Sequence, residues 1–230
     1  ESLPYALDPF QIRACRAVAR GDAVLVAAPT GSGKTAVGEF AAHRALGLER
    51  RALYTTPIKA LSNQKFREFQ AAFGEERVGL LTGDASVNSS APIVVMTTEV
   101  LRNMLYSDPA ALGDVATVVL DEVHYLADRH RGAVWEEVII HLPPSVQVVA
   151  LSATVSNAEE FGGWLASVRG ATEVVLEERR PVPLDQHVYL DGQLLPLLTE
   201  GARVHPGTAA TVRHHQRVWE LGEHARGTRR

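Results

Sequence analysis

The chain has 230 residues, of which 46% are hydrophobic and 22% charged, and this composition excludes a wholly disordered protein. One cysteine, Cys15, excludes a disulfide framework and a multi-cysteine zinc site, and is compatible with a reducing cytoplasm. No run approaches the roughly 20 apolar residues of a membrane span, so we expect a cytoplasmic protein with no membrane partner.

The net charge of -4 argues weakly against a protein that simply coats nucleic acid. The average hides an asymmetry, because residues 201–230 hold six Arg and two Glu, a surplus of +4, while the other 200 residues carry -8. The same segment contains four His, but their spacing fits no recognised metal-ligand set. We therefore interpret residues 201–230 as a solvated tail.

Short apolar runs alternate with amphipathic stretches. The runs are rich in Val, Ile and Leu, as buried parallel strands are: Ala23–Ala28, Ala52–Tyr54, Val78–Leu81, Ile93–Met96, Thr117–Leu120, Val146–Leu151 and Glu173–Leu176. Periodicity and capping signals predict helices between them: Pro9–Ala19, Gly33–Leu46, Ile58–Phe73, Glu99–Tyr106, Ala133–Leu142, and one opened by a capping box at Ser156–Glu159 that ends near Val168. This alternation predicts an α/β fold, with a mostly parallel sheet covered by helices on both faces.

A glycine-rich loop follows the first predicted strand and opens the next helix: Ala28-Pro29-Thr30-Gly31-Ser32-Gly33-Lys34-Thr35. This is the context that a phosphate-binding loop requires. Gly31 and Gly33 permit a close backbone approach that a Cβ would prevent, and the N–H groups at the helix start face the anion. We predict that residues 29–35 bind a nucleotide, that Lys34 reaches its β- and γ-phosphates, and that the Thr35 hydroxyl ligates Mg²⁺.

The strand Thr117–Leu120 ends in two adjacent carboxylates, Asp121 and Glu122. An acid at a strand end can hold a metal ion, and a second acid can orient and deprotonate an attacking water. We predict that Asp121 ligates Mg²⁺ and that Glu122 is the general base, with Lys34 as the third catalytic residue. Such a pair alone is often a solvated loop, but the glycine-rich loop favours the catalytic interpretation.

In this order the motifs resemble the first RecA-like domain of superfamily 2 helicases of the DExH class, because Asp121-Glu122-Val123-His124 is a DEVH box. The finer resemblance is to the superkiller-type, exosome-associated RNA helicases and their bacterial relatives. It covers Leu7 to about Pro183, and four segments carry it: Leu7–Gln11, Thr55–Lys65, Met96–Arg102 and Asp121–Leu126, the last followed by Arg131–Glu137.

The resemblance implies further roles. Phe10 and Gln11 would recognise adenine by stacking and by an amide contact, although ordinary packing is the better interpretation without the family. His124, Ser152 and Thr154 would couple hydrolysis to movement along the nucleic acid. Three groups that follow predicted strands would bind nucleic acid: Pro57, Lys59 and Ala60; Thr82, Gly83 and Asp84; and Thr97, Thr98 and Glu99.

Hydroxyl and N–H groups contact phosphates without reading sequence, which gives an acidic domain a way to bind RNA. For Thr82, Thr97 and Thr98, turn chemistry and helix capping are the alternative interpretation, and both can hold together.

The predicted domains are a RecA-like ATP-binding domain at residues 1–184 and an interdomain linker or tail at 185–230, with a short helix at Gly192–Leu198. Because the chain begins with Glu1 and lacks the family's second RecA-like domain, we expect a fragment that is weak or inactive alone and needs that domain in cis. The leading hypothesis is the ATP- and Mg²⁺-binding half of an RNA helicase in RNA processing or decay. A DNA helicase of a related branch and a non-catalytic nucleotide-binding scaffold are the alternatives.

Overall fold

The structure is a computed structural model of the chain, and it describes residues 6–124, 132–154, 157–182, 185–190, 192–198, 204–214 and 216. Tyr125, Leu126, Arg131, Ser156 and the tail beyond residue 216 lie outside this part of the chain. The chain divides into two compact units, residues 1–180 and 181–230. No helix among the described residues combines the length and apolar character needed to span a bilayer.

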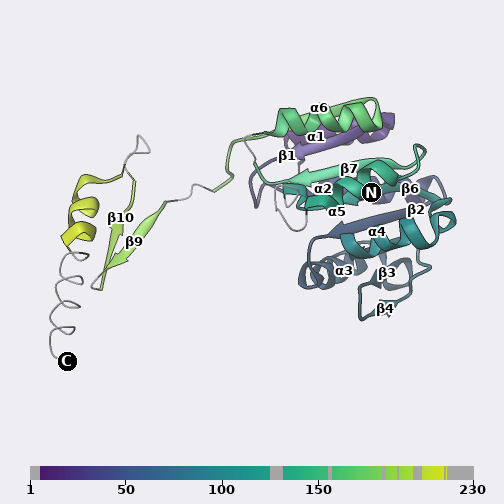
Figure 1. Cartoon of the computed structure of the whole chain (residues 1–230), viewed down its shortest axis with the longest axis horizontal. Coiled ribbons are helices and arrows are strands. Elements are labelled where there is room, and N and C mark those ends of the chain that lie inside the picture. Colours follow the sequence, from purple (N-terminus) through teal and green to yellow (C-terminus); the bar gives the residue numbers. More distant parts are fainter. Residues whose placement is uncertain are drawn as a thin grey trace. The chain divides into compact units, whose positions relative to one another are not determined.

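An eight-stranded sheet forms the centre of the first unit, in the order β4-β3-β5-β2-β6-β7-β1-β8 (Figure 1). All neighbouring strands are parallel except β3 and β4. The strands are β1 Ala23–Ala27, β2 Arg51–Thr56, β3 Val78–Leu81, β4 Ser86–Val87, β5 Ile93–Thr97, β6 Val115–Leu120, β7 Gln147–Ser152 and β8 Thr172–Leu176. The predicted α/β class and mostly parallel sheet are therefore confirmed.

Six α-helices of the first unit cover the two faces of the sheet: α1 Pro9–Arg20, α2 Thr35–Gly47, α3 Lys59–Phe73, α4 Thr98–Ser107, α5 Gly132–His141 and α6 Ala158–Arg169. Buried side chains of α1, α2 and α3 form one core layer, which includes Tyr54 and Phe69. Those of α4, α5 and α6 form the other, which includes Trp135. Because both faces are covered, the central strands are buried along most of their length, and β1 and β6 are buried throughout.

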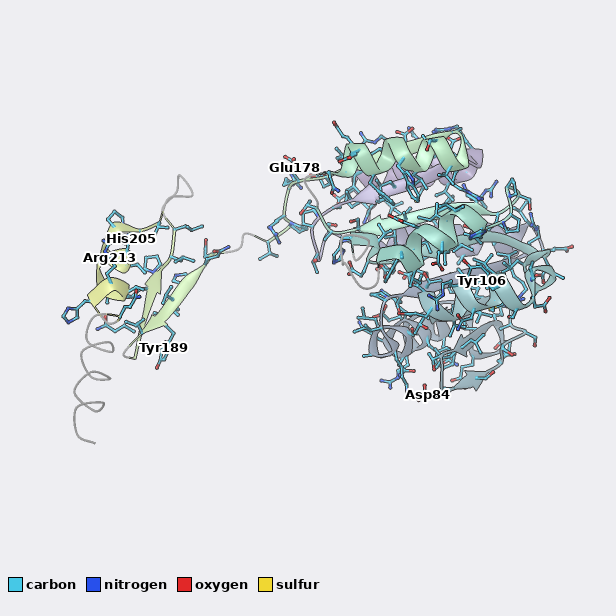
Figure 2. All side chains as sticks on the ribbon, viewed as in Figure 1. Asp84, Tyr106, Glu178, Tyr189, His205 and Arg213 are labelled. Carbon is cyan, nitrogen blue, oxygen red and sulfur yellow. The ribbon has the colours of Figure 1, made fainter. Side chains whose placement is uncertain are left out.

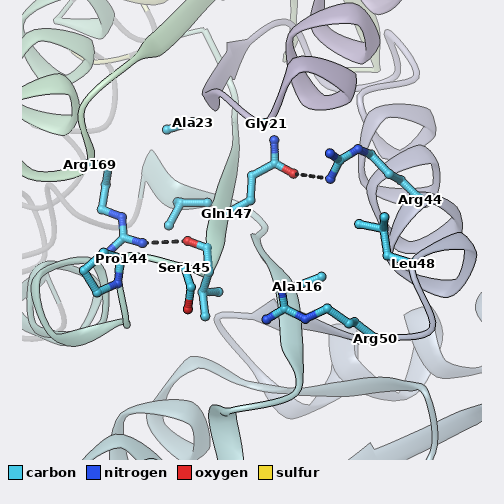
Figure 3. A pocket seen from close by; sticks show the side chains of 12 residues that line it. Gly21, Ala23, Arg44, Leu48, Arg50, Ala116, Pro144, Ser145, Gln147 and Arg169 are labelled. Carbon is cyan, nitrogen blue, oxygen red and sulfur yellow. Dashed lines mark hydrogen bonds between the residues drawn. The ribbon is translucent and has the colours of Figure 1, made fainter.

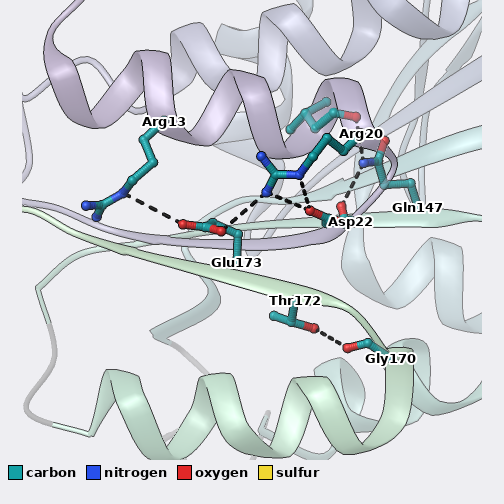
Figure 4. Close-up of polar contacts among 8 residues, drawn as sticks. Arg13, Arg20, Asp22, Gln147, Gly170, Thr172 and Glu173 are labelled. Carbon is teal, nitrogen blue, oxygen red and sulfur yellow. Dashed lines mark hydrogen bonds and ion pairs between the residues drawn. The ribbon is translucent and has the colours of Figure 1, made fainter.

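Polar contacts fix the first helix against the edge of the sheet. Arg20, in the last turn of α1, pairs with Asp22 and with Glu173 on β8 (Figure 4). The Nε2 atom of Gln147 donates to the carbonyls of Val18 and Asp22 at 3.0 and 2.7 Å. The ion pairs are partly exposed and contribute little to stability. The amide contacts connect the end of α1 to the start of β7.

The second unit contains an antiparallel hairpin, β9 His187–Leu190 and β10 Gln193–Pro196, and a helix over residues 206–214 (Figure 2). The helix packs on the hairpin through Thr208, which is buried and donates its hydroxyl to the Pro196 carbonyl at 2.6 Å. The predicted helix at Gly192–Leu198 is wrong: Gly192 turns the chain at φ +77°, and the next four residues pair with β9.

Two adjacent glycines of α6 provide a test of packing against the sheet. A Cβ at Gly162 would overlap the side chain of Val174 on β8, whereas a Cβ at Gly163 would meet no atom within 4 Å. We expect Gly162→Ala to lower the free energy of unfolding by about 1–3 kcal/mol, because the core must expand. Gly163→Ala should raise it by up to about 1 kcal/mol, because alanine favours the helix. Urea denaturation measures both, and equal effects would contradict this packing.

Candidate functional site

The predicted motifs lie at the carboxyl ends of the parallel strands, in two neighbouring groups. Strands β6, β7 and β1 are adjacent and lead into the acid pair, the Ser152–Thr154 segment and the glycine-rich loop. Strands β3, β5 and β2 are adjacent and lead into the three groups predicted for nucleic acid. Ligands of open α/β sheets bind at this edge, so the topology brings the predicted residues that follow strands to one edge of the sheet, whereas Phe10 and Gln11 lie on α1.

The glycine-rich loop has the backbone that its sequence predicts. Gly31 and Gly33 have φ values of +85° and +83°, which only glycine adopts without strain. The Nζ atom of Lys34 donates to the carbonyls of Ala28 and Pro29 at 2.8 and 3.2 Å. Burial lowers the pKa of Lys34, and the carboxylates of the acid pair oppose this shift. The lysine therefore lies over its own loop, facing those carboxylates.

Gln11 connects the first helix to the glycine-rich loop. Its Nε2 atom donates to the Gly33 carbonyl at 3.0 Å, and its Oε1 atom accepts the Asp8 N–H at 2.8 Å. A Cβ at Gly33 would lie 2.6 Å from Nε2, so this glycine is needed for the contact as well as for its φ. Phe10 is 5% exposed in the core, which leaves little of its ring for a base. Adenine recognition by this pair stays a prediction.

The acid pair leaves the end of β6 in a constrained conformation. The N–H of Asp121 donates to the Thr55 carbonyl, and Oδ1 of Asp121 accepts the N–H of Glu122 at 2.9 Å. Glu122 has φ +52°, a left-handed conformation that costs a non-glycine residue about 1–3 kcal/mol. Its Oε2 atom lies 3.2 Å from Nδ1 of His124. The contacts of Asp121 thus fix the backbone at Glu122, and the Glu122 carboxylate lies beside the ring of His124.

Tyr54 is a site residue that the sequence analysis missed. It lies on β2, is 1% exposed, and donates its hydroxyl to Oδ2 of Asp121 at 2.7 Å. Burial raises its pKa well above the usual value, and the carboxylate of Asp121 adds to the shift, so the hydroxyl keeps its proton and stays a donor. In the sequence, Tyr54 cannot be distinguished from an ordinary aromatic residue of a strand. Its contact with Asp121 becomes evident only from the pairing of β2 with β6.

The predicted coupling residues lie between the two nucleotide motifs. Ser152 ends β7, pairs in register with Ala27, and accepts the N–H of Ala28 on its carbonyl at 3.1 Å. The Oγ atom of Ser152 is buried, and it has no hydrogen-bond partner among the described residues. Thr154 is exposed. Ser152 is thus placed beside both the loop and the acid strand, as a coupling role requires.

A cavity of about 420 Å³ opens where these motifs meet. The phosphate loop, the acid pair and one face of α3 line it: Thr30, Gly31, Gly33, Lys34, Thr35, Leu61, Gln64, Lys65, Asp121 and Glu122. Lys65, which the predicted roles leave out, donates to Oγ1 of Thr35 at 3.1 Å and to Oε2 of Glu68 at 2.8 Å. Of the predicted nucleotide and metal residues, the cavity therefore brings together all but Phe10, Gln11, Pro29 and Ser32.

The polar atoms of the glycine-rich loop and the acid pair suit a nucleotide and a metal ion. The Oγ atom of Ser32 is buried with no hydrogen-bond partner in the described part of the chain, as expected of a group that contacts phosphate. The Thr35 hydroxyl and the Asp121 carboxylate are oxygen donors of the kind that Mg²⁺ prefers. The described residues include no cluster of three or more His, Cys, Asp and Glu that could hold another metal.

A second cavity, of about 230 Å³, lies at the amino ends of the strands. Arg44, Arg50 and Arg169 surround it (Figure 3). Arg169 donates to three carbonyls of the segment between α5 and β7, and Arg50 donates to the Val115 carbonyl. Arg44 reaches Oε1 of Gln147 at 3.5 Å. These guanidinium groups connect α2, α6 and the residue before β2 to the amino ends of β6 and β7 and the segment before β7, so we assign this cavity a structural role.

The residues predicted to bind nucleic acid differ in exposure. Pro57, Thr82 and Thr98 are buried, and the two hydroxyls bond within the chain, to Asp84 and to the ends of β2. The bond from Thr82 is the turn chemistry that the sequence also allows, whereas the predicted capping is wrong: Thr97 makes no side-chain cap hydrogen bond, and Thr98 bonds across to β2. The exposed members are Lys59, Ala60, Gly83 and Asp84, and the partly exposed ones are Thr97 and Glu99.

Lys59 and Asp84 form an ion pair across the ends of two neighbouring motifs. The hydrogen bond from Lys59 is the largest cause that lowers the pKa of Asp84. Figure 2 shows Asp84 at the solvent-facing rim of the first unit. A phosphate of the nucleic-acid backbone can compete with Asp84 for the ammonium group of Lys59. Lys59 is therefore the exposed cation of the predicted surface, and we call the edge formed by Lys59 and Asp84 the nucleic-acid rim.

Comparison with known proteins identifies the family. A family model described as DEAD/DEAH box helicase matches residues 8–161. The chain belongs to this helicase family. The match includes the glycine-rich loop, the acid pair and the predicted nucleic-acid groups, so the predicted helicase domain is confirmed.

Individual relatives support the finer resemblance. The probable helicase HelY of Mycobacterium leprae is 61% identical over 202 residues, which is 88% of this chain and 22% of that protein. The antiviral helicase SKI2 of Saccharomyces cerevisiae is 43% identical over 227 residues, which is 98% of this chain and 17% of that protein. These relatives confirm the resemblance to superkiller-type helicases. The chain spans about a fifth of the length of the curated relatives it matches.

A solved structure shares the fold of this helicase domain. The DUF1998 helicase MrfA bound to DNA matches with a TM-score of 0.64 and 22% identity, over 74% of this chain and 27% of that one. At this identity the match supports the fold alone.

Removal of the Tyr54 hydroxyl should destabilise the domain. Tyr54→Phe keeps the ring and its contact with Phe69, whose centroid is 4.9 Å away, but removes the hydrogen bond to the Asp121 carboxylate. We expect a loss of about 1.5–3 kcal/mol in the free energy of unfolding, the usual range for a bond to a charged group. Tyr106→Phe is the control: Tyr106 is 59% exposed, and its loss should be under about 0.5 kcal/mol. Urea denaturation measures both, and equal losses would show that the bond to Asp121 is dispensable.

Proposed function

We propose that this chain is the ATP-binding domain of an RNA helicase, in which ATP hydrolysis drives movement along the nucleic acid. One observation carries the proposal: the phosphate loop and the acid pair line the same cavity, and the predicted nucleic-acid groups occupy the adjoining half of the same sheet edge.

The nucleotide chemistry follows from the residues around the cavity. The loop N–H groups and Lys34 would hold the phosphates, and Thr35 and Asp121 would hold Mg²⁺, which supplies charge neutralisation when bound. Glu122 would accept a proton from the water that attacks the γ-phosphorus, as the bond to the β–γ bridging oxygen breaks. His124 lies 3.2 Å from that carboxylate, and Tyr54 orients Asp121 by a hydrogen bond. Intact acids and lysine argue against a non-catalytic scaffold.

The domain alone lacks groups that the resemblance implies for full activity. In this family the arginines that stabilise transition-state charge come from a second RecA-like domain. We therefore propose that residues 1–184 form the ATP-binding domain, that 185–230 lead toward the rest of a longer helicase, and that the second domain completes the site in cis. The isolated chain is expected to bind ATP and to hydrolyse it slowly.

The proposed base can be tested by a single substitution. Glu122→Gln keeps the shape of the side chain but removes the proton acceptor, so we expect the ATPase rate to fall about 10²–10⁴-fold while nucleotide binding persists. Glu160→Gln, on the exposed face of α6, loses the same charge away from the cavity and should leave the rate unchanged. Phosphate release and equilibrium nucleotide binding are the two measurements. Hydrolysis that survives Glu122→Gln would assign the base elsewhere.

The proposed nucleic-acid rim can be tested at Lys59. Lys59→Ala removes the exposed cation beside Asp84, so we expect weaker binding of single-stranded RNA and a salt dependence reduced by about one phosphate contact. Arg16→Ala removes an exposed cation of α1 and serves as the control. Fluorescence anisotropy with RNA and DNA of the same sequence measures both effects. Binding of DNA tighter than RNA would favour the alternative DNA helicase.

A further inference from the structure

Lysine is rare in this chain, and each lysine lies at the proposed site. Only three of the 23 basic residues other than His are Lys: Lys34, Lys59 and Lys65. The first two belong to the phosphate loop and the nucleic-acid rim. Lys65 lies on α3, lines the nucleotide cavity, and has a side chain that is only 14% exposed. The proposed hydrolysis does not involve Lys65.

Lys65 points at the metal end of the cavity. Its Nζ atom donates to Oγ1 of Thr35, the proposed Mg²⁺ ligand, at 3.1 Å. It shares the cavity with Asp121 and Glu122, which lie where the metal and the terminal phosphate of ATP are expected. Its charge also contributes to the lowered pKa of Lys34, so the two ammonium groups act on one another across this cavity.

Two ammonium groups and a divalent cation carry more positive charge than the carboxylates of Asp121, Glu122 and Glu68 beside them can offset, which favours a further anion in this cavity. A threonine hydroxyl has two acceptor positions, so a metal ion on Thr35 would stand directly beside Lys65, and the two cations would repel. The flexible lysine stem lets the ammonium turn from Thr35 toward a phosphate oxygen. In that movement the Glu68 carboxylate would lose its hydrogen bond from Lys65. It would keep the one from Gln64, whose Nε2 atom donates to Oε1 of Glu68 at 2.7 Å.

We propose that Lys65 is a second phosphate-binding cation, which contacts the terminal phosphate of ATP and makes the domain prefer ATP to ADP. This inference rests on the proposed function and adds a specificity-determining residue to it. The diphosphate of ADP would end at the loop and at Lys34, so it would gain little from Lys65. The triphosphate would extend toward Asp121 and Glu122, which line the same cavity as Lys65.

Nucleotide binding by the 230-residue chain tests the proposal. The probes are N-methylanthraniloyl derivatives of AMPPNP and ADP, titrated with excess Mg²⁺ and followed by fluorescence. We expect Lys65→Gln to weaken AMPPNP binding about tenfold and ADP binding less than twofold, and Lys65→Arg to retain most of the preference. Arg67→Gln, an exposed neighbour on α3 that loses the same charge, should change neither affinity.

A second measurement uses the unaltered chain and does not depend on how the variants fold. Acetylation of each lysine by an amine-reactive ester is followed by peptide mass spectrometry. We expect Mg²⁺-AMPPNP to slow modification of Lys65 about tenfold relative to Mg²⁺-ADP. Lys59, on the exposed rim, should react at the same rate with either nucleotide.

The outcomes separate this inference from the proposed function. If the unaltered chain binds neither nucleotide, the proposed ATP site is wrong, and the inference falls with it. If it binds both but Lys65→Gln changes neither affinity, or weakens both equally, then Lys65 only supports Thr35 and the inference alone is overturned. Equal acetylation of Lys65 with AMPPNP and ADP would overturn it in the same way.

Discussion

The pairing of β2 with β6 joins the half of the sheet that leads into the nucleotide motifs to the half that leads into the predicted nucleic-acid groups. These parallel strands lie next to each other in the middle of the sheet, and the ladder continues past the end of β6, where the Asp121 N–H donates to the Thr55 carbonyl. On one side of this pair lie the strands that lead to the nucleotide motifs, and on the other lie the strands that lead to the nucleic-acid groups. A shift of register here would displace both sets of residues together.

Side-chain contacts from one segment reinforce that junction. Tyr54 on β2 holds the carboxylate of Asp121, and Lys65 on the following helix reaches Thr35 at the start of α2. The same helix begins at Lys59, at the nucleic-acid rim. Six residues of α-helix span about 9 Å, so one helix carries a residue of each proposed site. Residues 51–73 therefore join the proposed nucleotide site to the proposed nucleic-acid surface in one continuous segment.

The sequence predicted the elements whose signals are local. Seven strands of the main sheet were detectable because each contains an apolar run, and the glycine-rich loop because its spacing permits so few other backbones. Strand β4 was not, since its two residues are exposed and carry no apolar pattern. The hairpin β9–β10 was mistaken in part for a helix, because Leu194 and Leu195 suit either structure until their partners are known. Tyr54 and Lys65 form hydrogen bonds with residues distant in sequence, Asp121 and Thr35, so no local sequence pattern predicts these contacts.

The position of β1 in the sheet has a consequence for how the domain folds. The strand that precedes the phosphate loop is the first in the chain, yet it pairs only with β7 and β8, the last two strands of this sheet. The pair between Ala27 and Ser152 can therefore form only after Ser152 has been synthesised, and pairing between residues so distant in sequence is slow. As the chain leaves the ribosome, the nucleic-acid half can assemble first from consecutive segments. The nucleotide site is completed last, so a nascent domain cannot bind ATP until nearly all of it has been made.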